Sequence, residues 1–158
     1  MGASGWEYVT PFAGTVEASL MALHARVFEE LYGDDDTYGD LDELWEDEEF
    51  MGEEGTHSVL DIPRVVHTTA PPSDRRLADY GTLRPLAPDR LTHHFGTGRP
   101  TPARFELVLA EADAAIGVPP GRTGTLRDEC RMRWTGVYVL LYTGDEPTHV
   151  GIFGFSGD

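Results

Sequence analysis

The sequence predicts an α+β domain with a mostly antiparallel sheet, two long amphipathic helices packed on one of its faces, and a C-terminal β-hairpin. Two helical apolar stripes and one apolar run followed by turn residues support this prediction. The chain of 158 residues is long enough to bury about two-thirds of its unfolded surface in one core. We therefore expect residues 1–158 to form a single domain.

The first strand and the first long helix follow each other directly. Residues 6–10 alternate in polarity and stop before Pro11, as a short strand does. Thr15 can cap a helix of about 17 residues that ends at Gly33. The buried face of this helix is marked by apolar residues three and four positions apart, namely Val16, Leu20, Leu23, Val27 and Leu31.

The middle of the chain has less regular patterns. Residues 41–51 predict a second, shorter helix, because their apolar side chains fall on one face. Residues 56–67 are β-branched and alternate in polarity, which predicts a long strand with a bulge or an edge position at Pro63. A further strand is expected at 81–86, and a short helix at 88–95.

The last part of the chain supplies the second long helix and the hairpin. Thr101 caps this helix. Its buried stripe consists of Phe105, Val108, Leu109, Ala112 and Ile116. Residues 137–142 are apolar on both faces, as in a central strand, and residues 150–155 return beside them. Cys130 and Trp134 are expected in a strand that leads into the hairpin.

Half of the acidic residues lie in one segment that contains neither Arg nor Lys. Residues 29–54 hold fourteen of the 28 carboxylates. From His57 onward, twelve acids and eleven arginines nearly balance. The formal net charge of −16 is therefore mostly a local property. We expect an acidic helix–loop insert at about 33–55 within the single domain.

Composition restricts the partners and the compartment. A chain this acidic repels phosphate backbones and anionic lipid headgroups, so we expect neither nucleic acid nor a membrane as a partner. Cys130 is the only cysteine, and the first residues lack a secretory pattern, which predicts a cytoplasmic protein. Lys, Asn and Gln are absent, which we interpret as the codon bias of a GC-rich bacterial genome.

The short acidic helix is the first candidate site. Apolar anchors among carboxylates could dock on a basic protein, with charge steering the encounter. The partner-binding residues predicted in this way are Asp42, Glu43, Leu44, Trp45, Glu46 and Asp47. In the alternative interpretation, Leu44 and Trp45 pack into the protein's own core and the acids keep the chain soluble.

The loop before this helix is a candidate divalent-cation site. Its spacing follows part of the EF-hand pattern, because carboxylates and a glycine fall at ligand and turn positions. Two positions depart from the pattern: Tyr38 replaces an oxygen ligand, and Trp45 stands where a glutamate should close the site. Calcium is therefore the one cofactor considered, and the alternative is a solvated linker without an ion. The predicted ligands are Asp34, Asp36, Asp40 and Asp42.

The third candidate is a small enzyme with a His, Asp and Arg site on the sheet. His57, Asp61 and His67 have the residue types of a catalytic or metal triad. On one extended strand the two histidines would lie roughly 33 Å apart, so each would need partners from other strands. Cys130 would be a nucleophile only if nearby arginines lowered its pKa, and a buried thiol is the simpler expectation.

These patterns favour a small acidic cytosolic binding protein of the immunity or inhibitor type. It would engage a basic protein through the acidic segment and have no catalytic activity. A calcium-binding protein and a small enzyme are the alternatives.

Overall fold

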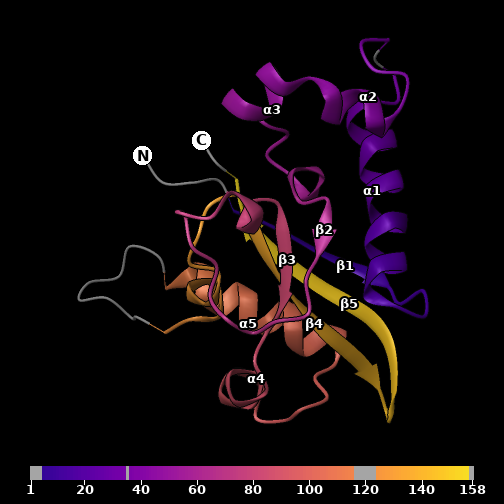
Figure 1. Ribbon diagram of the computed structural model, residues 1–158. Coiled ribbons are helices and arrows are strands. Elements are labelled where there is room, and N and C mark those ends of the chain that lie inside the picture. The colour runs from indigo at the N-terminus through magenta and orange to yellow at the C-terminus, as the bar shows by residue number, and fades with distance from the viewer. Residues whose placement is uncertain (1–4, 35, 116–123, 157–158) are drawn as a thin grey trace.

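The computed structural model describes residues 5–34, 36–115 and 124–156 (Figure 1). The strands in this part of the chain are β1 (Gly5–Pro11), β2 (Arg64–Val65), β3 (Thr82–Pro85), β4 (Thr135–Thr143) and β5 (Glu146–Phe155). The α-helices are α1 (Val16–Tyr32), α2 (Leu41–Glu46), α3 (Glu48–Glu53), α4 (Pro88–Phe95) and α5 (Pro102–Ala114). Short 3₁₀ turns are η1 (Val59–Asp61), η2 (Leu77–Asp79) and η3 (Leu126–Glu129).

The strands form one mixed sheet in the order β1-β5-β4-β3-β2. β5 pairs antiparallel with both β1 and β4, whereas β3 pairs parallel with both β4 and β2. The prediction of a mostly antiparallel sheet is therefore wrong, although the α+β class is confirmed. Parallel neighbours need a crossover connection, and the segment that contains α4 and α5 provides it between β3 and β4.

The C-terminal hairpin is confirmed, with strands longer than predicted. β4 and β5 pair along their whole length, from Thr135 opposite Phe155 to Thr143 opposite Glu146. The pairing shifts register between Leu141 and Tyr142. This hairpin occupies the centre of the sheet, so its side chains contact both layers of helices.

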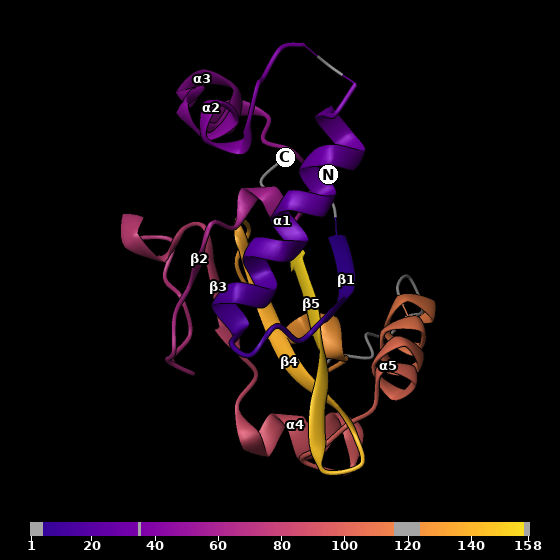
Figure 2. The ribbon, with the colours of Figure 1, turned by 90° about the vertical axis from the view of Figure 1, so that its right-hand side faces the viewer.

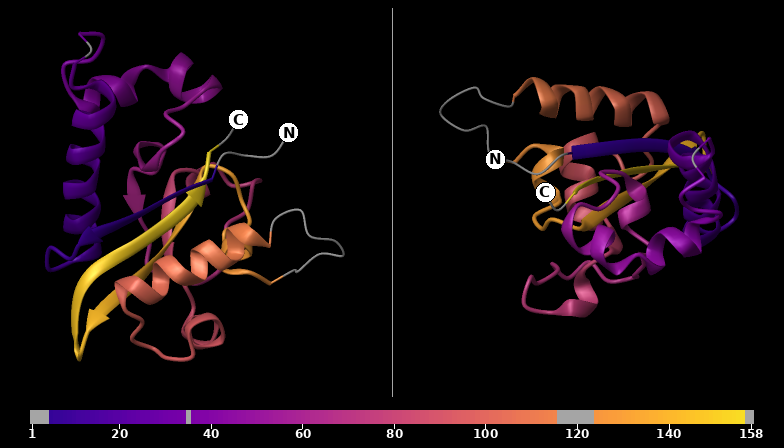
Figure 3. Two further views of the ribbon diagram at one scale, coloured as in Figure 1. Left: turned by 180° about the vertical axis from the view of Figure 1, so that it is seen from behind. Right: turned by 90° about the horizontal axis from the view of Figure 1, so that it is seen from above.

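The two long helices lie on opposite faces of the sheet (Figures 2 and 3), and the expectation that they share a face is wrong. On one face, Leu23 of α1 belongs to a buried cluster with Tyr138 and Ile152. On the other face, Phe105 of α5 belongs to a cluster with Phe153. Neighbouring side chains along a strand point to opposite faces, so an apolar central strand needs a helix on each.

The helix boundaries follow from their caps. The Thr15 hydroxyl accepts a hydrogen bond from the Ala18 N–H at 3.0 Å, and Thr101 accepts one from Arg104 N at 3.1 Å. α4 ends at Gly96, which adopts a left-handed φ of 71° that favours glycine. α1, α4 and α5 are thus confirmed. The predicted end of the α5 stripe at Ile116 lies outside the described residues.

The predicted strand at 56–67 is wrong. The Ser58 hydroxyl caps η1 by accepting from Leu60 N at 3.1 Å, which turns the chain where an extended strand was expected. Only Arg64 and Val65 pair with β3. β-branched residues therefore reflect burial here, because Val59 and Ile62 are fully buried outside any strand.

The expected incoming strand before the hairpin is also wrong. Residues 126–129 form η3 instead, where Thr125 and Asp128 make a reciprocal capping box. Cys130 ends this turn, and Trp134 has a φ of 63° that no extended strand adopts.

The acidic insert folds as two short helices at the end of the molecule opposite the β4–β5 turn (Figure 1). The single predicted helix at 41–51 divides at Asp47, which ends α2 and caps α3. None of the helices in the described ranges is long and apolar enough to cross a membrane.

Candidate functional site

The acidic platform, defined as residues 40–54, is attached to the core through its apolar side chains. Leu44 is fully buried among side chains of the α1 face of the sheet. The Trp45 indole donates to Leu60 O at 2.7 Å, and its ring meets His24 edge-to-face at a centroid distance of 5.5 Å. These contacts hold α2 against α1 and η1 in one orientation.

Polar contacts fix the start of the platform and the junction between α2 and α3. The Asp40 carboxylate accepts from Glu43 N at 2.9 Å, and the Glu43 carboxylate accepts from Gly39 N at 2.7 Å. The Asp47 carboxylate accepts from Phe50 N at 3.0 Å and from the Tyr38 hydroxyl at 2.8 Å. The hydrogen bond from the Phe50 backbone and then that from the Tyr38 hydroxyl lower the pKa of Asp47 and keep it ionised.

The platform therefore turns carboxylates, and not its apolar anchors, toward solvent. Its exposed acids are Asp40, Asp42, Glu43, Glu46, Glu48, Glu49, Glu53 and Glu54. Of the six predicted partner-binding residues, Leu44 faces the protein's own core, and Trp45 and Asp47 are half-buried in contacts just described. A partner would accordingly meet charge on this surface.

In the described part of the chain, none of the ion pairs involves these carboxylates. Every ion pair between described residues uses an acid outside 29–54. Arg127, for example, pairs with Asp113 of α5 and with Glu7 of β1, and Arg99 pairs with Asp145. The arginines of these pairs, Arg76, Arg84, Arg90, Arg99 and Arg127, are thus engaged with acids outside the acidic segment.

The predicted calcium ligands are not assembled in the described part of the loop. Asp34, Asp36 and Asp42 are exposed, and Asp40 caps α2. Among the described residues, no group of three His, Cys, Asp or Glu side chains is placed to hold a metal ion. Asp35 lies outside those residues. Calcium binding stays a prediction, which calorimetric titration with calcium and magnesium would test.

The predicted catalytic triad is divided between separate environments. His67 lies 2.9 Å from the Glu17 carboxylate on the surface of α1. His57 is exposed and has a φ of 53°. Asp61 is buried, and its Oδ1 accepts from both Thr56 N and Thr56 Oγ1 at 2.6 and 2.8 Å. Burial raises the pKa of Asp61, although these donors oppose the shift.

Cys130 is a buried thiol, in agreement with the simpler of the two predictions for it. Its Sγ lies 3.5 Å from the Thr135 hydroxyl and 3.4 Å from Thr135 O. Burial raises the pKa of this thiol, and hydrogen bonding with Thr135 and the nearby Arg127 charge only partly oppose the shift. A nucleophilic role would need the opposite shift.

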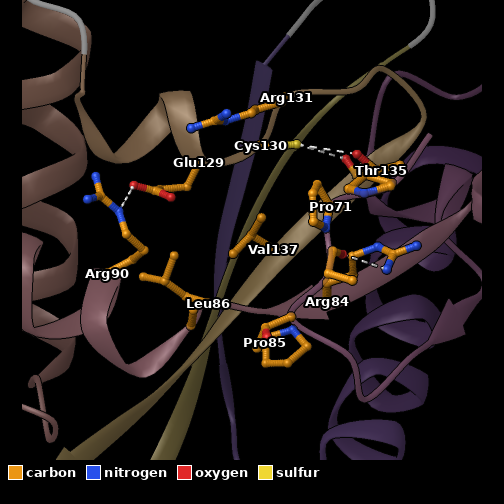
Figure 4. Close-up of a pocket in the computed structure, with 15 residues that line it drawn as sticks. Pro71, Arg84, Pro85, Leu86, Arg90, Glu129, Cys130, Arg131, Thr135 and Val137 are labelled. Carbon is orange, nitrogen blue, oxygen red and sulfur yellow. Dashed lines mark hydrogen bonds and ion pairs between the residues drawn. The ribbon is translucent and has the colours of Figure 1, made fainter. Parts of the chain in front are cut away.

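A cavity of about 380 Å³ between β3, β4 and α4 escaped the sequence analysis (Figure 4). It brings together Arg84, Arg90, Glu129 and Arg131, which come from three separate segments. No local spacing joins these residues, so only the parallel pairing of β3 with β4 places them together. No protein-family model, curated protein or solved structure matches this chain.

Proposed function

We propose that this protein is a non-catalytic binding protein of the immunity or inhibitor type, which covers a basic surface of a partner protein with its acidic platform. The observation that carries the proposal is the exposed, unneutralised row of carboxylates on two helices anchored to the core. Such a surface favours cationic partners by charge complementarity.

The anchoring matters for affinity. Carboxylates on a flexible linker would lose conformational freedom when a partner binds, and this loss weakens the complex. Leu44 and Trp45 already order α2, and Asp47 orders α3, before any partner arrives. The platform thus presents its charge in a preorganised form.

The absence of catalysis is part of the same proposal. His67 is committed to Glu17, and Asp61 accepts two bonds from Thr56. The pKa of Cys130 is raised by burial. His67 and Asp61 thus have structural contacts, and the thiol of Cys130 has a pKa unsuited to nucleophilic attack.

Two variants of equal net charge distinguish the effect of the platform carboxylates from the effect of the protein's net charge. The platform variant D42N/E46Q/E49Q/E53Q removes four exposed acids that make no capping bond. The matched control D74N/D89N/E106Q/E111Q removes four exposed acids elsewhere. Each variant thus removes four negative charges from a protein of net charge −16.

The test is affinity capture of basic proteins from the native extract by the wild type and both variants. We expect the wild type and the control to retain the same basic protein and the platform variant to lose it. Equal retention by all three proteins, or equal loss from both variants, would contradict the proposal, because the location of the charge would then be irrelevant.

A further inference from the structure

The cavity of Figure 4 lies on the α5 face of the sheet, opposite the acidic platform. Cys130, Val137 and Leu86 in its wall belong to the α5-side cluster, whereas Leu44 of the platform belongs to the α1-side cluster. Its volume of about 380 Å³ is within the range of small-molecule sites. The cavity is thus a separate feature from the surface proposed above.

The charges around the cavity leave one cation without a counterion. Arg84 is paired with Asp79 at 2.9 Å, and Arg90 with Glu129 at 2.9 Å. Partial burial opposes ionisation of Glu129, but hydrogen bonds from His94 and Arg90 lower its pKa, so the carboxylate stays charged. Arg131 is exposed and has no hydrogen bond or ion pair within the described residues.

Hydrogen-bond donors remain free at the same site. In the described part of the chain Arg90 uses only its Nε, toward Glu129, which leaves its terminal nitrogens available. The Nε of Arg84 is buried and has no partner there. Figure 4 shows Arg131 and Arg90 at the end of the cavity where Glu129 lies. Guanidinium groups match the planar geometry of a carboxylate.

Apart from Thr69 and Thr135, the remaining side chains of the wall are apolar. Leu86, Val137, Pro71 and Pro85 are among these apolar side chains (Figure 4). A ligand that fills the cavity would place an apolar body on these side chains and its charge beside the arginines. One uncompensated cation in a protein of net charge −16 suits a monoanion better than a dianion.

We infer that this cavity binds a small organic monocarboxylate with a short apolar body, held chiefly by Arg131 and the free nitrogens of Arg90. Inorganic phosphate shares the guanidinium contacts but gains nothing from the apolar wall. Phosphate should therefore bind more weakly than such an acid.

The protein is titrated separately with benzoate, benzyl alcohol and inorganic phosphate, and binding is monitored by the NMR shifts of its backbone amides. Benzoate should saturate at about 10 mM or below and shift amides of β3, β4 and η3. Substitution R131Q should weaken benzoate about tenfold and leave the unfolding midpoint unchanged. The matched control R99Q also removes one arginine, at a position outside the lining of this cavity, and should leave benzoate affinity unchanged.

Three results would overturn the inference. If the amide shifts do not saturate with benzoate, the cavity is not a binding site for it. Equal weakening by R131Q and R99Q assigns the binding to net charge and not to the cavity. Phosphate or benzyl alcohol that binds as tightly as benzoate removes the monocarboxylate as the ligand class.

Discussion

At the scale of single residues, Asp61 shows how a buried acid can be tolerated. Its Oδ1 accepts two bonds from Thr56, and Ser156 Oγ lies 3.4 Å from Oδ2. Burial nevertheless raises its folded-state pKa above the ordinary value. The folded state then binds the proton more tightly than the unfolded state. The contribution of Asp61 to stability therefore declines as pH rises from the carboxyl's ordinary pKa through its raised, folded-state pKa.

Substitution D61N tests the direction of this pH dependence of stability. Asn keeps an oxygen acceptor for Thr56 but carries no charge, so its free energy of unfolding relative to the wild type should increase as pH rises from about 4 to 7. D61A removes the acceptor and should cost about 1–3 kcal/mol. Urea denaturation across this pH range measures both. A relative stability of D61N that falls with pH would contradict the assignment.

The thiol of Cys130 should be unreactive in the folded protein. Cys130 is 6% exposed, and burial raises the pKa of its thiol, so little reactive thiolate is present or accessible to solvent. Labelling with a thiol reagent at neutral pH should be slow and should accelerate with urea in proportion to the unfolded fraction. Rapid, complete labelling without denaturant would show that the thiol is accessible.

At the scale of elements, the platform depends on one buried side chain. Leu44 is the only fully buried residue of α2 and α3 among those described. Its removal would leave a cavity between α1, α2 and η1 and free the acidic helices from the core. The charged face, in contrast, makes few contacts with the rest of the protein.

Substitution L44A should destabilise the protein by about 2–5 kcal/mol. The matched control is L107A, which truncates a leucine of α5 that is 49% exposed and should change stability by about 0.5 kcal/mol or less. Chemical denaturation compares the two. Equal effects would mean that Leu44 does not anchor the platform.

Elements with local signals could be predicted, and those set by distant contacts could not. Thr15, Thr101 and Gly96 fix helix ends through bonds within a few residues, so the sequence pattern was sufficient. The segment 56–67 has the composition of a strand, but Ser58 turns it and only two of its residues find a partner in β3. The mixed sheet depends on a crossover that no local pattern specifies.

The same distinction applies to the candidate sites. The concentration of acids is visible in the sequence, whereas the inward direction of Leu44 and Trp45 depends on contacts with distant residues that no local pattern specifies. The cavity arginines belong to different segments and became neighbours only through the sheet.

At the scale of the whole molecule, charge is divided between two faces of the sheet. The platform lies on the α1 face and is purely anionic, whereas the cavity on the α5 face carries one uncompensated arginine. Exposed charges of this kind are screened beyond about 8 Å at physiological ionic strength. Binding through the platform should therefore depend steeply on salt.

The most direct test of the central claim is calorimetric titration of the captured basic partner with the wild type, the platform variant and the matched control at low and high salt. We expect D42N/E46Q/E49Q/E53Q to weaken binding at least tenfold at low salt, equivalent to about 1.4 kcal/mol, and high salt to reduce this difference. D74N/D89N/E106Q/E111Q should bind as the wild type does. Identical affinities for the two variants would contradict the account.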